Sequence, residues 1–330
     1  MTASDPFGSR HGCAPTGDCV GFGVDRSEAP RPGPGHVVVA VEAVALADEE
    51  RWEKGATVRT AVPRRVGWSG RVEETGPGVD TGLRGRKTVV RTLPAPRPST
   101  SSGGYGQRSA AGRYVLRRHL VVPLDRLHLL PSDADLATAA LLEPAAVAAA
   151  AFEAAAVQTR PRVAVLGADC VGLLLVQMMT AMSPLALVVV DPSPDRGGRA
   201  LAWGATRHCT TVEAARTEGV FDVVVDTTGS AGSPGAACLL AARAGQVVFT
   251  RAFPPGTKPL DQAQLALRRL TVRAAAVDAP AVWDTAVRLF REGVIDPRPL
   301  VSRWLEPTVL ADGFIGPRSE GGTVTVLRIP

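Results

Sequence analysis

The chain has 330 residues, of which 45% are hydrophobic and 21% are charged, and its formal net charge is +5. These values exclude a largely disordered chain, and the length is enough for two domains with separate cores. The basic residues are almost all arginine and are dispersed among acids, so they predict an ordinary solvated surface and no nucleic-acid partner.

The termini and the cysteines predict a cytoplasmic protein. No apolar run approaches the roughly 20 residues that cross a bilayer. The first 21 residues also lack the apolar centre of a signal peptide. The cysteines are odd in number and show no metal-binding spacing, which favours reduced thiols over disulfides or a zinc cluster. They are Cys13, Cys19, Cys170, Cys209 and Cys238. We expect no membrane partner.

The N-terminal part of the chain predicts a β-rich domain. The run His36–Val44 alternates in the manner of a strand, and β-like runs follow at Gly70–Glu73, Lys87–Arg91 and Tyr114–Pro123. Residues 93–112 are rich in Pro, Ser and Gly and predict a long exposed loop.

From Asp133 the composition becomes typical of helices, with Pro144 predicting a break between two of them. After this region short apolar strands alternate with helices, which implies a parallel sheet covered on both faces. The expected strands are Arg162–Leu166, Leu185–Val190, Phe221–Asp226, Gly245–Thr250 and Thr271–Ala276, and the expected helices include Val171–Met182, Ala231–Ala242 and Ala281–Glu292.

The segment "VAVLGADCVG", residues 163–172, is typical of a strand that enters a glycine turn and opens a helix. Such a turn is the usual cradle of a dinucleotide diphosphate. Gly167 and Gly172 fill the outer glycine positions. Asp191 ends the next strand, at the spacing where an acid binds the ribose hydroxyls. The pattern predicts NAD(H), because a carboxylate there repels the 2′-phosphate of NADP(H). The nearby Arg196 leaves NADP(H) possible.

Asp169 stands where the middle glycine is expected, and two interpretations are open. Its carboxylate would cap the helix at Val171 and occupy the anion site itself, or it would point outward with its charge offset by Arg196 or Arg251. The candidate cofactor-binding residues are Gly167, Asp169, Cys170, Val171, Gly172, Asp191, Arg196, Thr228 and Arg251.

Several segments in order resemble the medium-chain dehydrogenase/reductase superfamily, and within it the zinc alcohol, polyol and aminocyclitol dehydrogenases. The resemblance runs through nearly the whole chain from about Gly33. It is carried by "GPGHVVVAVEAVALADEERWEKG", "VGWSGRVEETGPGV", "LLEPAAVA", "FDVVVDTTGS" and "ARAGQVVFT". It implies an α/β protein with a GroES-like β-rich catalytic domain over 1–150, completed by about 295–330. A Rossmann-type, doubly wound parallel sheet over 151–294 would bind the dinucleotide.

The zinc ligands of that family have no counterpart here. Its catalytic Cys falls on Ala47, its His on Val66 and the Glu that follows on Gly67, and the segment 92–112, which would hold a structural zinc, contains no Cys. Of the ligand set only Glu143 is left, and one carboxylate cannot hold zinc. The sequence predicts that both zinc sites are absent.

A zinc-free member needs another group to polarise or protonate the substrate oxygen. Relative to the family, Glu49 falls on a proton-relay Ser or Thr and Trp52 on a relay His. Glu49 would act as a general acid opposite Glu143, or it belongs to a solvated helical turn. Glu143 would alternatively brace the domain junction. Trp68 would line a pocket or belong to the core. These four residues are the catalytic candidates.

The resemblance implies a zinc-independent NAD(P)(H)-dependent oxidoreductase that works as a homodimer or homotetramer in bacterial specialised biosynthesis. Its substrate would be small and polar: sugar- or cyclitol-like, or a conjugated carbonyl or imine. Two alternatives are open. The protein would be a catalytically silent relative that binds a nucleotide or a partner protein, or a non-redox epimerase or dehydratase that uses bound NAD.

Overall fold

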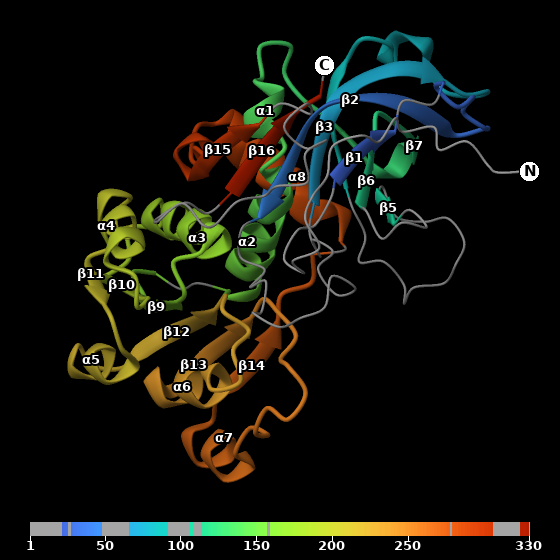
Figure 1. The fold of residues 1–330 in the computed structure, drawn as a ribbon. Coiled ribbons are helices and arrows are strands. Elements are labelled where there is room, and N and C mark those ends of the chain that lie inside the picture. Colours follow the sequence, from blue (N-terminus) through green and yellow to red (C-terminus); the bar gives the residue numbers. More distant parts are fainter. Residues whose placement is uncertain are drawn as a thin grey trace, which may run out of the picture.

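The computed structural model describes residues 22–25, 28–47, 66–91, 106–108, 114–156, 159–277, 279–305 and 324–329. The described residues form two large sheets on opposite sides of the molecule, with a layer of helices between them (Figure 1). None of the helices described has both the length and the apolar character needed to span a bilayer.

The first sheet has seven strands, ordered β15-β16-β2-β3-β4-β8, with β7 paired to β2. A separate three-stranded sheet is ordered β1-β6-β5. The bounds are β1 (Phe22–Asp25), β2 (His36–Ala47), β3 (Val66–Thr75), β4 (Lys87–Val90), β5 (Gly106–Arg108), β6 (Tyr114–Arg117), β7 (His119–Pro123), β8 (Leu127–Leu129), β15 (Val301–Leu305) and β16 (Val324–Arg328). Short 3₁₀ turns, η1 (Thr81–Leu83), η2 (Leu124–Arg126) and η3 (Arg298–Leu300), lie beside the strands.

A register shift in β2 lets one strand serve two cores. The pairing of β2 with β3 shifts between Val41 and Ala43. Before the shift, Val39 and Val41 face the core of the first sheet, and after it Ala43 and Ala45 face the helical layer. An extra residue in a strand reverses the alternation of its side chains, which accounts for this change of face.

The second sheet has six parallel strands in the order β11-β10-β9-β12-β13-β14. Its strands are β9 (Arg162–Leu166), β10 (Ala186–Val190), β11 (Arg207–Cys209), β12 (Phe221–Asp226), β13 (Ala241–Phe249) and β14 (Thr271–Ala274). Its helices are α3 (Cys170–Thr180), α4 (Pro194–Ala202), α5 (Val212–Thr217), α6 (Ser233–Leu240) and α7 (Gln262–Arg268). The direction of winding reverses between β9 and β12, which makes their carboxyl ends the switch point where such sheets bind ligands.

The helical layer consists of α1 (Leu136–Ala139), α2 (Leu142–Ala154) and α8 (Pro280–Arg291). In Figure 1, α2 lies between the two sheets. One continuous apolar core includes α2, α3, α8 and residues of β2 and β16. The proposed domain boundary at residue 150 therefore falls inside α2, within a core that both sheets share.

Most of the expected elements are present, with local differences. The bounds of β9 and β12 agree with the sequence, whereas Tyr114–Pro123 is divided into β6 and β7. The break between α1 and α2 falls at residues 140–141, and not at Pro144, which lies in the first turn of α2. Proline is tolerated there because a first-turn amide has no partner within the helix. The strand β5 lies inside the segment predicted as a loop.

Candidate functional site

The glycine turn after β9 has the geometry that a dinucleotide cradle requires. Gly167 has a φ of +97°, which favours glycine, and a Cβ there would lie 2.6 Å from the hydroxyl of Thr227. A Cβ on Gly172 would overlap the carbonyl oxygen of Gly167. The two glycines therefore allow the tight turn and the close contact of α3 with the strand, which are the roles expected of them.

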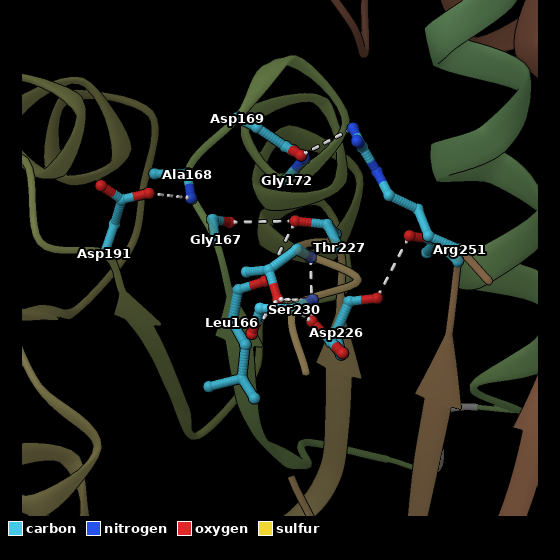
Figure 2. A network of polar contacts seen from close by, with 12 residues as sticks. Leu166, Gly167, Ala168, Asp169, Gly172, Asp191, Asp226, Thr227, Ser230 and Arg251 are labelled. Atoms are coloured by element: carbon cyan, nitrogen blue, oxygen red, sulfur yellow. Dashed lines mark hydrogen bonds and ion pairs between the residues drawn. The ribbon is translucent and has the colours of Figure 1, made fainter. Parts of the chain in front are cut away.

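The carboxylate of Asp169 turns onto the N-terminus of α3 (Figure 2). Its Oδ1 accepts a hydrogen bond from the amide of Gly172 at 2.7 Å, and its Oδ2 lies 3.0 Å from Nη2 of Arg251. The side chain thus caps the helix, as in the first interpretation, although at Gly172 and not at Val171. Arg251 offsets its charge.

Arg196 pairs with a different acid. Its Nη2 lies 2.9 Å from Oδ1 of Asp191. Of the two arginines expected to offset the charge of Asp169, the structure therefore pairs Arg251 with it, and not Arg196. The two arginines divide between the two acids because Arg196 belongs to α4, next to β10, whereas Arg251 follows β13 on the other side of the switch point.

Asp191, at the end of β10, is 3% exposed, and its carboxylate contacts three residues. Its Oδ2 accepts a hydrogen bond from the amide of Ala168 at 2.8 Å, and its Oδ1 accepts one from Ser193 at 2.9 Å besides pairing with Arg196. The carboxylate therefore joins the glycine turn to the end of β10, at the place where the spacing of the acid predicts the ribose of a cofactor.

A network of hydrogen bonds lies at the end of β12. Of its residues, only Thr228 was a candidate from the sequence. Asp226 is buried, and its Oδ1 accepts hydrogen bonds from the amide of Thr228 at 2.9 Å and from its hydroxyl at 2.7 Å. The Thr227 hydroxyl donates to the carbonyl of Leu166 at 3.0 Å, which joins β12 to β9 (Figure 2). The signal was an acid and two threonines directly after an apolar strand, in "VVVDTTG".

Cys170 and Val171 are placed differently from the other candidates. Both are buried in the apolar core that includes α2 and α3. Their side chains therefore do not face a ligand at the turn. The backbone of these two residues is the part that would contribute to a diphosphate site, and their place among the cofactor-binding candidates stays a prediction.

The fold implies a dinucleotide cofactor, and most of the described residues fit one. The turn, the acid after β10 and Thr228 all follow the carboxyl ends of neighbouring parallel strands, where ligands bind in such sheets. The misfit is at the first turn of α3, where the carboxylate of Asp169 takes the position of the bound anion.

At the position of the family's catalytic zinc, the residues that the structure describes do not fit a metal. Val66 is buried in the core of the first sheet, and a Cβ on Gly67 would overlap the carbonyl oxygen of Ala140 and lie 3.3 Å from Cβ of Glu143. The junction of α1 and α2 therefore fills the space that a longer side chain at position 67 would need. Within the described ranges, no three His, Cys, Asp or Glu residues are grouped as metal ligands.

The catalytic candidates are only partly described. Glu49 and Trp52 lie outside the described residues. Trp68 is 2% exposed and packs in the core of the first sheet, as in the second of its two interpretations; its catalytic role stays a prediction. Glu143, in the first turn of α2, is 5% exposed and lies beside Gly67, at the contact between β3 and the helical layer.

Together, the reversed strand order, the glycine turn and the acid after β10 define a protein with the dinucleotide-binding fold of dehydrogenases. Residues 170–292 match the family model of the zinc-binding dehydrogenases. The (R,R)-butanediol dehydrogenase of Bacillus subtilis is 24% identical over 276 residues, which are 80% of this chain and 79% of that protein.

Solved structures share the fold. An alcohol dehydrogenase of Escherichia coli, determined with NADH, has a TM-score of 0.74 at 18% identity and covers 92% of this chain and 94% of its own. A protein of Sinorhizobium meliloti described as a zinc-binding dehydrogenase, determined with NADP, has a TM-score of 0.72 at 21% identity with the same coverage. The chain shares the two-domain fold of the medium-chain dehydrogenase/reductases, a GroES-like and a Rossmann-type domain, and its residues 170–292 match one of their family models. The proteins it resembles are dehydrogenases, two of them determined with NADH or NADP.

Proposed function

We propose that this protein is a zinc-independent, NAD(P)(H)-dependent oxidoreductase that acts on a small polar substrate. The observation that carries the proposal is the crossover β9–α3–β10, in which the Gly167 turn and Asp191 meet through the hydrogen bond to Ala168. This arrangement combines the turn for a diphosphate with an acid beside the ribose position.

The zinc-free part of the proposal rests on packing. The positions of the family's ligands carry Ala47, Val66 and Gly67, and the carbonyl of Ala140 leaves no room for a ligand side chain at position 67. A carbonyl reduction without zinc needs another proton donor. Glu49 is the proposed donor, and Glu143 is proposed to brace the contact with β3.

A substrate in which a double bond is conjugated to a carbonyl or imine suits such a site. The cofactor, when bound, supplies or accepts the hydride. In a conjugate reduction the hydride goes to the β-carbon and a proton to the α-carbon. The negative charge is meanwhile delocalised over the conjugated system, so the demand for a metal at the oxygen is smaller. A sugar- or cyclitol-like alcohol or ketone is the other proposed substrate class, and it follows from the likeness to the polyol branch of the family.

NAD(H) is the proposed preference over NADP(H). Asp191 is a carboxylate at the ribose position, and its partner Arg196 is held against it at 2.9 Å. An arginine paired in this way is not directed at a 2′-phosphate. We further propose a cytoplasmic homodimer or homotetramer that binds neither nucleic acid nor membrane, as part of a bacterial specialised biosynthetic route.

The test is calorimetric titration with NADH and NADPH, followed by turnover assays with enones, imines, ketones and cyclic polyols in the presence of a chelator. The proposal expects binding of at least one cofactor and chelator-resistant turnover of one substrate class. Absence of binding at millimolar concentrations of both cofactors would refute it.

A second candidate is a catalytically silent relative. The observation that favours it is the contact between Asp169 and Arg251, because a carboxylate already holds the helix terminus that a diphosphate would use. For this candidate we expect no turnover with any substrate of the panel, even where a nucleotide binds.

A further inference from the structure

We propose that Asp169 is a built-in competitor of the cofactor diphosphate and that Arg251 is the cation for which the two anions compete. This inference rests on the proposed function, since it concerns the entry of the same cofactor. It assigns Arg251 as a positioning residue. It also predicts that the wild-type chain binds diphosphate ligands more weakly than a variant without the Asp169 charge.

The two oxygens of Asp169 occupy two of the donors that an anion would use at this turn. Oδ1 takes the amide of Gly172 in the first turn of α3, and Oδ2 takes the guanidinium of Arg251. Helix N-terminal amides and arginine are also the preferred partners of phosphate oxygens. The carboxylate therefore imitates one phosphate group of the absent ligand.

Arg251 is brought to this position from a distant part of the sequence. It follows β13 and lies 82 residues after Asp169. A Cβ on Gly229 would lie 2.9 Å from Cβ of Arg251, so a residue without a side chain lets the arginine approach the turn. The Arg251 side chain is 27% exposed, which places its guanidinium at the surface of the site and not in the core.

A bound diphosphate and the carboxylate cannot occupy the turn together. Both carry negative charge, and both would lie against the amide of Gly172. Cofactor binding therefore requires Asp169 to rotate away and to release Arg251, and the apparent affinity falls with the fraction of molecules in that open state. Removal of the charge alone should raise the affinity.

The experiment is calorimetric titration of ADP-ribose, which has the diphosphate, and of adenosine, which lacks it. The variants are Asp169→Asn and Asp169→Ser, whose side-chain oxygens still cap the helix, so the fold is retained. The matched control is Asp195→Asn, which removes the same charge from the exposed first turn of α4. Arg251→Gln is made in the wild-type and in the Asp169→Asn background.

The expected result is an increase of roughly tenfold or more in affinity for ADP-ribose in both Asp169 variants, a factor that corresponds to about 1.4 kcal/mol. Adenosine binding and the Asp195→Asn variant should match wild type. Arg251→Gln should weaken ADP-ribose binding in both backgrounds, because the released arginine is the partner that the diphosphate gains.

The other outcomes separate this inference from the proposed function. If wild type binds ADP-ribose as tightly as the Asp169 variants do, or if Asp195→Asn raises the affinity as much, the proposed competition is refuted and the oxidoreductase proposal stands. If only the Asp169 variants bind, the competition is right and the natural chain is the silent relative. If no variant binds either ligand, both ideas fail.

Discussion

The carboxylate of Asp191 accepts a hydrogen bond from the backbone amide of Ala168 at 2.8 Å, so the end of β10 is joined directly to the glycine turn after β9. The same carboxylate pairs with Arg196 and leaves Arg251 to Asp169. Two acid–arginine pairs therefore lie on either side of the turn. In each pair the arginine offsets the negative charge of a carboxylate that lies beside the proposed nucleotide site.

Asp191→Asn should change the choice between the two cofactors. Removal of the charge ends the repulsion of a 2′-phosphate and releases Arg196 to pair with it. We expect the ratio of NADH to NADPH affinities to fall by about tenfold, or 1.4 kcal/mol. Titration of both cofactors measures the ratio.

Two results inform on this prediction. Arg196→Gln combined with Asp191→Asn should lose the gained NADPH affinity, because the cation is then missing. An unchanged ratio in Asp191→Asn would show that this carboxylate does not face the ribose.

Gly67→Ala should destabilise the protein, because its Cβ would overlap the carbonyl oxygen of Ala140 in the junction of α1 and α2. Overpacking of this kind costs about 1–3 kcal/mol. Chemical denaturation measures the loss.

Gly198→Ala is the control for this substitution. Gly198 lies in α4 with open space around its Cα, so alanine there should raise stability by up to about 1 kcal/mol. If Gly67→Ala proved as stable as wild type, the contact between β3 and the helical junction would be looser than described.

His128 should make stability depend on pH. Its Nδ1 lies 3.0 Å from Oδ1 of Asp284, and its ring stacks on Trp283. Burial lowers the pKa of His128 from the ordinary 6.5, against the opposing effect of Asp284 and with a further lowering by Arg91. Among the described residues its buried Nε2 has no hydrogen-bond partner, so a proton added there would be unsatisfied.

The direction of this pH dependence of stability follows from proton linkage. Below about pH 6.5 the unfolded chain binds the proton more readily than the folded one, so the free energy of unfolding falls as the pH is lowered. Above that pH His128 is neutral in both states and its contribution to stability is fully present. His128→Gln should reduce this acid sensitivity when melting is followed between pH 5 and pH 7.5. His36→Gln, at the first residue of β2, where the ring makes an exposed hydrogen bond to the carbonyl of Pro34, is the control. Equal acid sensitivity of His128→Gln and wild type would contradict the prediction.

Metal removal should leave the protein unaffected. Without a ligand set at Ala47, Val66 and Gly67, elemental analysis should find no stoichiometric zinc, and dialysis against a chelator should alter neither melting temperature nor NADH affinity. One tightly held zinc per chain, whose removal lowers either quantity, would overturn the zinc-free proposal.

The regular elements of the second sheet were predictable because their signals are local. The apolar runs of β9 and β12 are short, continuous and bounded by turn residues, so their bounds agree with the structure. The helix predicted over Ala231–Ala242 ends earlier, at Leu240, because β13 begins at Ala241. Pairing with β12 decides that residue, and no local pattern shows it.

The amino-acid sequence by itself determined the class of fold, the two outer glycines of the turn and the acid after β10, since each depends on residue type and spacing. Only the tertiary structure decided that Asp169 turns onto α3, that Arg251 and not Arg196 meets it, and that Trp68 is in the core. These outcomes depend on strand order and packing between residues far apart in the chain, and local periodicity carries no information about such contacts.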